Sequence, residues 1–190
     1  MLLSAVIFSH GAYHLLLGEN GGVLTQGYYV DYSVAGETFM REIRNYYDFM
    51  VRYLHVLYEP TLRDVSMTHV EGDNLEYVFE GVPFSAYGEP GKVWTVVREN
   101  EKYKLVSFIN FTNNSEDYWN QGKNRPRAQS EVKVRILMER EAKSVFLASP
   151  DTEIGRPTEL EAVYEDGPRG NTLVLTVPVT HIWGLLVVEL

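Results

Sequence analysis

The first sixty residues combine two short apolar runs with one long amphipathic stretch. Residues 2–9 are apolar on most sides and stop before Gly11, which predicts a buried helix ending near a glycine. Residues 12–17 form an apolar run between Gly11 and Gly18, and we expect a strand buried on both faces, as in parallel sheets. A polar, glycine-rich loop follows at residues 18–22.

The clearest helical pattern covers residues 36–58, and Pro60 marks its end. Its apolar positions recur at three- and four-residue steps and comprise Phe39, Ile43, Tyr46, Met50, Leu54 and Leu57. Such a stripe needs a partner surface larger than the short N-terminal segment. We expect the stripe either to be exposed, which would favour self-association, or to fold back on the β-sandwich that the later residues predict.

After Pro60 the hydrophobic period changes to two, with turn signals between the segments. The predicted strands cover residues 93–98, 104–110, 131–138, 144–147, 159–164, 172–177 and 182–189. Seven short strands without helices between them favour an antiparallel β-sandwich. The sequence thus predicts a mainly β protein, in which the sandwich of residues 61–190 follows the last strand and helix of a β/α barrel in residues 1–60. A complete barrel would need eight such units.

Composition narrows the classes of partner. The net charge of −9 argues against a nucleic-acid partner, and no basic run is present that would bind an acidic membrane surface. The chain has no cysteine, so disulfides and thiolate metal sites are excluded, and its five histidines are scattered. The apolar N-terminal run lacks a basic flank and is too short for a signal peptide or a membrane span. We expect neither a metal nor a cofactor.

Several segments, in order along most of the chain, resemble glycoside hydrolase family 66, which contains endo-dextranases and cycloisomaltooligosaccharide glucanotransferases. The similar segments are residues 11–19, 44–57, 93–97, 105–110 and 180–186. The resemblance implies that a barrel carries the chemistry and that a Greek-key β-sandwich follows it. It also implies a parent enzyme that is secreted or bound to the cell surface.

The chemistry of the family requires groups that this chain does not supply. The resemblance implies cleavage of α-1,6-glucan with retention, which needs two carboxylates about 5–5.5 Å apart. In the family both lie on earlier barrel strands. Glu19 is the only carboxylate at the end of a predicted buried parallel strand, where barrels place active groups. We therefore expect this chain to be a fragment of a dextran-degrading enzyme and to contain no catalytic residue. The parent enzyme is either a hydrolase or a cyclising transferase.

Four residues are candidates for contact with α-1,6-glucan or an isomaltooligosaccharide. Glu19 could bind a glucose hydroxyl or be a solvated loop acid, and His14 is more typical of a satisfied core histidine than of a ligand. Tyr118 and Trp119 lie in the polar loop 113–122, where they could stack on a sugar or anchor the loop on the sheet. The pair supports an alternative function as a non-catalytic α-glucan-binding module. The missing barrel portion, supplied by a separate polypeptide, is a further expected partner.

Overall fold

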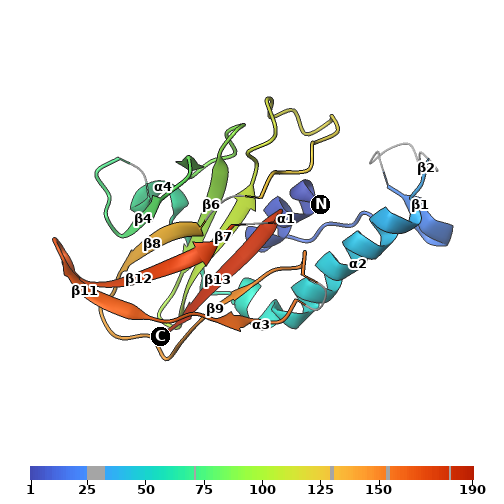
Figure 1. Cartoon of the computed structure of the whole chain (residues 1–190). Coiled ribbons are helices and arrows are strands. Elements are labelled where there is room, and N and C mark those ends of the chain that lie inside the picture. Colours follow the sequence, from blue (N-terminus) through green and yellow to red (C-terminus); the bar gives the residue numbers. More distant parts are fainter. Residues whose placement is uncertain (25–32, 71, 129–130, 153–154, 180) are drawn as a thin grey trace.

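The computed structural model describes residues 1–24, 33–70, 72–128, 131–152, 155–179 and 181–190. These residues form three layers, in which helices cover one face of a larger sheet and a smaller sheet covers the other (Figure 1). The helical elements are α1 (Leu2–Ser9), the 3-10 turn η1 (Glu19–Gly21), α2 (Glu37–Arg52), α3 (Leu54–Leu57) and α4 (Ser66–His69). Within the described residues, no helix is both long and apolar enough to cross a bilayer.

The strands form two principal sheets, and every pairing in them is antiparallel except that of β5 with β6. The larger sheet has the order β10-β9-β13-β7-β6-β3, with β5 beside β6, and the smaller has the order β11-β12-β8-β4. The strands of the larger sheet are β3 (Arg63–Asp64), β5 (Phe84–Ser85), β6 (Val93–Glu99), β7 (Tyr103–Asn110), β9 (Ser144–Ala148), β10 (Thr158–Glu159) and β13 (Trp183–Glu189). The smaller sheet contains β4 (Tyr77–Glu80), β8 (Glu131–Leu137), β11 (Val163–Gly167) and β12 (Gly170–Pro178). A separate ribbon pairs β1 (Gly22–Val23) with β2 (Ser33–Val34).

The larger sheet is buried on both faces. On β13, Leu186 and Val188 pack into the core shared with the smaller sheet, whereas Leu185 and Val187 pack into the core shared with the helices. Successive side chains of a strand point to opposite faces, so a strand covered on both sides must be apolar at nearly every position. This explains the apolar run of residues 185–188 in β13.

The smaller sheet has one face in the core and the other toward solvent. On β8, Val132 and Val134 are buried, while Glu131 before them and Lys133 between them are exposed. This alternation is the period of two seen in the sequence. The mainly β character and the antiparallel sheets are confirmed, while the Greek-key connectivity and the domain boundary near residue 60 stay predictions.

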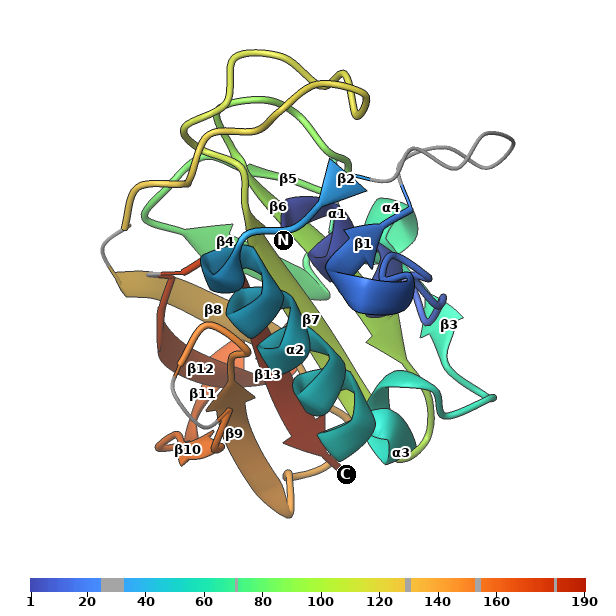
Figure 2. The same cartoon turned by 90° about the vertical axis from the view of Figure 1, so that its right-hand side faces the viewer.

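Helix α2 lies across the larger sheet (Figure 2), and its apolar stripe packs on that sheet. Ile43, Tyr46 and Met50 are buried there, as the pattern predicted, together with Phe49. The predicted single helix is broken at Tyr53, whose backbone leaves the helical region between α2 and α3. Leu57 of α3 is also buried, whereas Phe39 is half-buried and Leu54 is exposed. Of the two alternatives for the stripe, the structure therefore adopts burial against the sandwich for all its members except Leu54.

The expected strand at residues 12–17 does not form in the described chain, so this prediction is wrong. Leu17 makes a single β-bridge to Val23, and no ladder continues from it. A strand buried in a parallel sheet needs neighbours on both sides, and the described residues offer only the short ribbon of β1 and β2. The Tyr47 hydroxyl instead donates to the His14 carbonyl (2.5 Å) and accepts from the Leu16 N–H (3.3 Å).

The strand predicted over residues 159–164 is divided between the two sheets. Thr158 and Glu159 pair with β9 of the larger sheet, and the chain then crosses to the smaller sheet, where β11 begins at Val163. The apolar pattern continues through this crossing, so periodicity alone does not reveal it. The short strands β3, β4 and β5 were not predicted because two to four residues are too few to establish a period.

Candidate functional site

Trp119 lies in the loop between β7 and β8 and is both anchored and accessible. Its ring stacks on Phe111 with a centroid separation of 5.8 Å and an interplanar angle of 9°. Phe111 is buried directly after β7, so the stack fixes the orientation of the indole. Trp119 nevertheless remains 39% exposed. The indole thus anchors its loop and still offers part of its surface to solvent.

Charged groups hold the loop around Trp119. The Lys123 ammonium lies 2.7 Å from Glu116 Oε1 and 5.7 Å from the centroid of the Trp119 ring, and it also donates to the Tyr118 carbonyl. The hydrogen bond from Lys123 lowers the pKa of Glu116 below its ordinary value. The Glu116 carboxylate also accepts the Tyr118 N–H at 2.6 Å. These contacts order the loop backbone on both sides of the indole.

Asparagine side chains tie the two arms of the same loop together. Asn110 Nδ2 donates to the Arg127 carbonyl, and Asn113 Nδ2 donates to the Arg125 carbonyl, each at 2.9 Å. Asn114 Oδ1 accepts the N–H of Asn124 at 2.9 Å. These three amides replace a regular strand ladder, so the polar loop has a defined shape although it contains no strand.

In front of Trp119 lies a hollow of about 330 Å³, which we call the Trp119 hollow. It is lined by Met1, Leu2, Leu3, Phe39, Glu42, Trp119, Gln121, Lys123, Asn124, Arg125, Pro126 and Ile182. The hollow lies between the loop and the helices, and the Arg125–Glu42 ion pair (3.1 Å) joins the two sides. An aromatic face beside amide and charged groups can contact the apolar face and the hydroxyls of a sugar ring.

The other sequence candidates lie outside the Trp119 hollow in the described structure. Tyr118 is 63% exposed and is held through its backbone. Glu19 is exposed in η1, and His14 Nδ1 lies 3.0 Å from the Ser4 hydroxyl oxygen. Burial, and then the nearby positive amino terminus, lower the pKa of His14. Sugar contact by Glu19, His14 or Tyr118 therefore stays a prediction.

The sequence reading missed a polar contact beneath the helices. The carboxylate of Asp151 accepts the Tyr46 hydroxyl at 2.8 Å through Oδ1 and the Trp183 backbone N–H at 2.9 Å through Oδ2. Burial raises the pKa of Asp151, and burial together with this carboxylate raises that of Tyr46 well above its ordinary value. Asp151 follows β9 in a short loop, and no sequence motif distinguishes it from other loop acids. Its role comes from the packing of α2.

Comparison with known proteins places this architecture in a family. The model of "Glycosyl hydrolase family 66" matches residues 1–187. Two cycloisomaltooligosaccharide glucanotransferases of Niallia circulans are 26% and 24% identical, each over 97% of this chain and 19% of its own length.

A crystal structure of a Paenibacillus sp. cycloisomaltooligosaccharide glucanotransferase, complexed with cycloisomaltoheptaose, matches with a TM-score of 0.84 and 25% identity. That match covers 98% of this chain and 26% of the other. The chain therefore spans about one fifth of the length of the curated relatives it matches. The likeness covers both the helices and the sheets, and this chain belongs to glycosyl hydrolase family 66.

Proposed function

We propose that this chain is the C-terminal portion of an α-1,6-glucan-degrading glycoside hydrolase, in which residues 1–60 complete the catalytic barrel and residues 61–190 pack a β-sandwich against it. On this proposal the chain is not catalytic alone, because the carboxylate pair lies in the remaining part of the enzyme. The similarity to glucanotransferases over one fifth of their length supports this division. The parent reaction is hydrolysis or cyclising transfer.

The state of residues 12–17 is the observation that carries the proposal. This apolar segment has a single β-bridge in the described structure, and Tyr13 and Leu15 are 65% and 84% exposed. A neighbouring part of the barrel would cover these exposed apolar side chains. On α2, Val51 is likewise 64% exposed, on the side opposite the buried stripe.

The proposal predicts dependence on an upstream partner. The purified chain should release no reducing sugar from dextran, and activity should appear when it is mixed with the upstream portion of a family relative. Leu15→Asp should weaken this association by at least roughly tenfold, because a charge would replace a buried apolar contact. Reducing-sugar release and co-purification measure the two effects.

Val163→Asp is the matched control, because Val163 is also exposed but lies on β11 of the smaller sheet. Equal association of the Leu15→Asp and Val163→Asp variants would contradict the assignment of residues 12–17 to the barrel contact. Reducing-sugar release by the chain alone would contradict the division of catalytic groups.

The Trp119 hollow supports a second candidate function, the binding of α-glucan without cleavage. The stack on Phe111 orients the indole before any ligand arrives, which reduces the entropy that a sugar contact must overcome. Lys123, Asn124 and Gln121 provide hydrogen-bonding groups at the rim. This function is compatible with the first, because a sandwich beside a catalytic barrel can hold the same polymer.

This second function is tested with Trp119→Ala. We expect the affinity for dextran to fall about three- to tenfold, which corresponds to the loss of one aromatic contact. Affinity electrophoresis in dextran gels measures the change. Tyr87→Ala, which removes an exposed aromatic side chain outside the Trp119 hollow and outside residues 12–17, is the control and should leave dextran affinity unchanged. Unaltered migration of the Trp119→Ala variant would remove the Trp119 hollow as a glucan site.

A further inference from the structure

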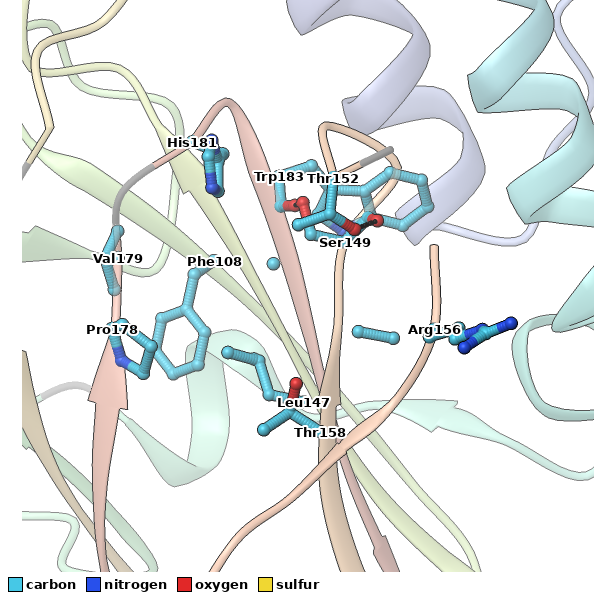
Figure 3. Close-up of a pocket in the computed structure, with 12 residues that line it drawn as sticks. Phe108, Leu147, Ser149, Thr152, Arg156, Thr158, Pro178, Val179, His181 and Trp183 are labelled. Carbon is cyan, nitrogen blue, oxygen red and sulfur yellow. Dashed lines mark hydrogen bonds between the residues drawn. The ribbon is translucent and has the colours of Figure 1, made fainter. Parts of the chain in front are cut away.

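A second, smaller pocket lies at one end of the larger sheet, beside the last residues of β12 (Figure 3). Its volume is about 140 Å³. Its lining includes Gly184 of β13 and, around it, Phe108, Leu147, Ser149, Thr152, Pro178 and His181. We call it the Gly184 pocket. It shares no lining residue with the Trp119 hollow.

The pocket exists because β13 carries a glycine at this position. Residue 184 lies on the same face of the strand as Leu186, which fills the core between the sheets. The backbone does not require the glycine, since Gly184 pairs with Phe108 in an unbroken register and lacks a positive φ. An added Cβ would lie 3.6 Å from Leu147 Cδ1, an ordinary contact. A glycine within a strand can mark a bulge, a tight bend, or close approach by a ligand or another backbone. The regular register of β13 argues against a bulge, and only a side-chain atom, Leu147 Cδ1, lies within 4 Å of the added Cβ, which favours approach by a ligand.

The lining of the pocket combines apolar and polar side chains. Phe108, Leu147 and Pro178 provide carbon surface, and the view in Figure 3 shows Phe108 close to Pro178 and His181 above them. The Arg156 guanidinium points away from the other labelled side chains, so we assign it no contact.

The hydroxyl groups of the pocket are oriented by backbone contacts. Ser149 Oγ donates to the Trp183 carbonyl at 2.7 Å, and Thr152 Oγ1 donates to the Ser149 carbonyl at 2.9 Å. Ser149 Oγ also accepts the Asp151 N–H at 3.2 Å. The remaining lone pair of Ser149 Oγ and those of Thr152 Oγ1 can accept hydrogen bonds from a ligand. A pyranose matches this arrangement, because its C–H face is apolar and its edge carries hydroxyl groups.

We propose that the Gly184 pocket binds one glucosyl unit of an α-1,6-glucan, as a site separate from the Trp119 hollow. The choice of sugar rests on the proposed function, and the size of the pocket sets the limit of one ring. Phe108 and Pro178 contact the apolar face of the ring, while His181, Ser149 and Thr152 contact its hydroxyls.

The test is a calorimetric or NMR titration of the full chain with isomaltose. Gly184→Leu should weaken binding by at least roughly tenfold, because the new side chain occupies the space of the sugar, and His181→Ala should weaken it about threefold. Gly184→Ala, whose Cβ makes only an ordinary contact, adds a smaller obstruction and should give an intermediate loss. Each variant is first checked for an unchanged circular dichroism spectrum. His55→Ala, at an exposed position on α3, is the control for the histidine change.

Two outcomes would overturn the inference. One is unchanged isomaltose affinity in both Gly184→Ala and a folded Gly184→Leu variant. The other is the absence of isomaltose binding by the unmodified chain up to about 10 mM. Neither outcome bears on the barrel contact, which is tested separately through Leu15→Asp. Loss of isomaltose binding on Trp119→Ala alone would assign the sugar to the Trp119 hollow and likewise overturn the inference.

Discussion

Replacing Trp183 with alanine is expected to lower the free energy of unfolding by about 3–5 kcal/mol. Trp183 is fully buried in β13. Its ring centroid lies 4.9 Å from that of Phe49, 6.1 Å from Tyr46 and 6.4 Å from Phe8. These partners belong to α2 and α1, so the indole fills the junction between the helices and the larger sheet. Truncation leaves a cavity that rigid elements on both sides cannot close.

Urea unfolding followed by circular dichroism measures this loss. Hydrogen exchange in α2 should also accelerate, because the helix loses a large part of its contact with the sheet. Trp119→Ala is the matched control, since it removes a half-exposed indole and should cost less than about 1.5 kcal/mol. A loss of similar size in the two variants would contradict the assignment of Trp183 as the main contact between helices and sheet.

Replacing Asp151 with alanine should lower the free energy of unfolding by about 2–4 kcal/mol. The change leaves the Tyr46 hydroxyl and the Trp183 N–H without their acceptor, and each unsatisfied buried donor costs about 1–3 kcal/mol. The substitution removes little apolar volume, so the loss reports on hydrogen bonding more than on packing. Urea unfolding is again the measurement. Thr152→Ala, which truncates the next residue, should cost less than Asp151→Ala.

The pH dependence of the Asp151 contribution has a defined sign. Burial raises the pKa of Asp151 above its ordinary value of 3.8, so the folded chain binds this proton more tightly than the unfolded chain. The contribution of Asp151 to stability is therefore largest below pH 3.8, where the carboxyl is protonated in both the folded and the unfolded chain. It decreases as the pH rises from 3.8 through the higher pKa that Asp151 has in the folded chain. Asp151→Asn keeps one oxygen acceptor and cannot ionise.

Comparison of Asp151→Asn with the unmodified chain isolates this effect, because the other titrating groups are shared. The stability of the unmodified chain relative to the variant should fall as the pH rises above 3.8. The contribution of Glu99 to stability increases with pH instead. Burial raises the pKa of Glu99, but the hydrogen bonds from Lys104 and Tyr77 have the larger effect, so the pKa lies below its ordinary value. A difference between the two proteins that does not change with pH would contradict the raised pKa of Asp151.

Part of the candidate site was readable from the sequence. The aromatic pair in the polar loop indicated that Trp119 either anchors the loop on the sheet or stacks on a sugar. In the structure the Trp119 ring is stacked on Phe111 and is also accessible to solvent. Lys123 and Phe111, which hold the indole, carry no motif of their own. The Gly184 pocket was not predicted, because a glycine in a strand pattern does not show whether a neighbour or a ligand fills the space.

The sequence by itself determined the positions of β6, β7, β8, β9, β12 and β13 and the buried stripe of α2, because a period of two or of 3.6 is a local property of each element. Only the tertiary structure decided that the stripe covers the larger sheet, that this sheet is buried on both faces, and that Asp151 lies under Tyr46. It also decided that residues 12–17 form no strand here and that residues 159–164 divide between two sheets. Each of these features depends on a partner distant in sequence, and local periodicity does not specify that partner.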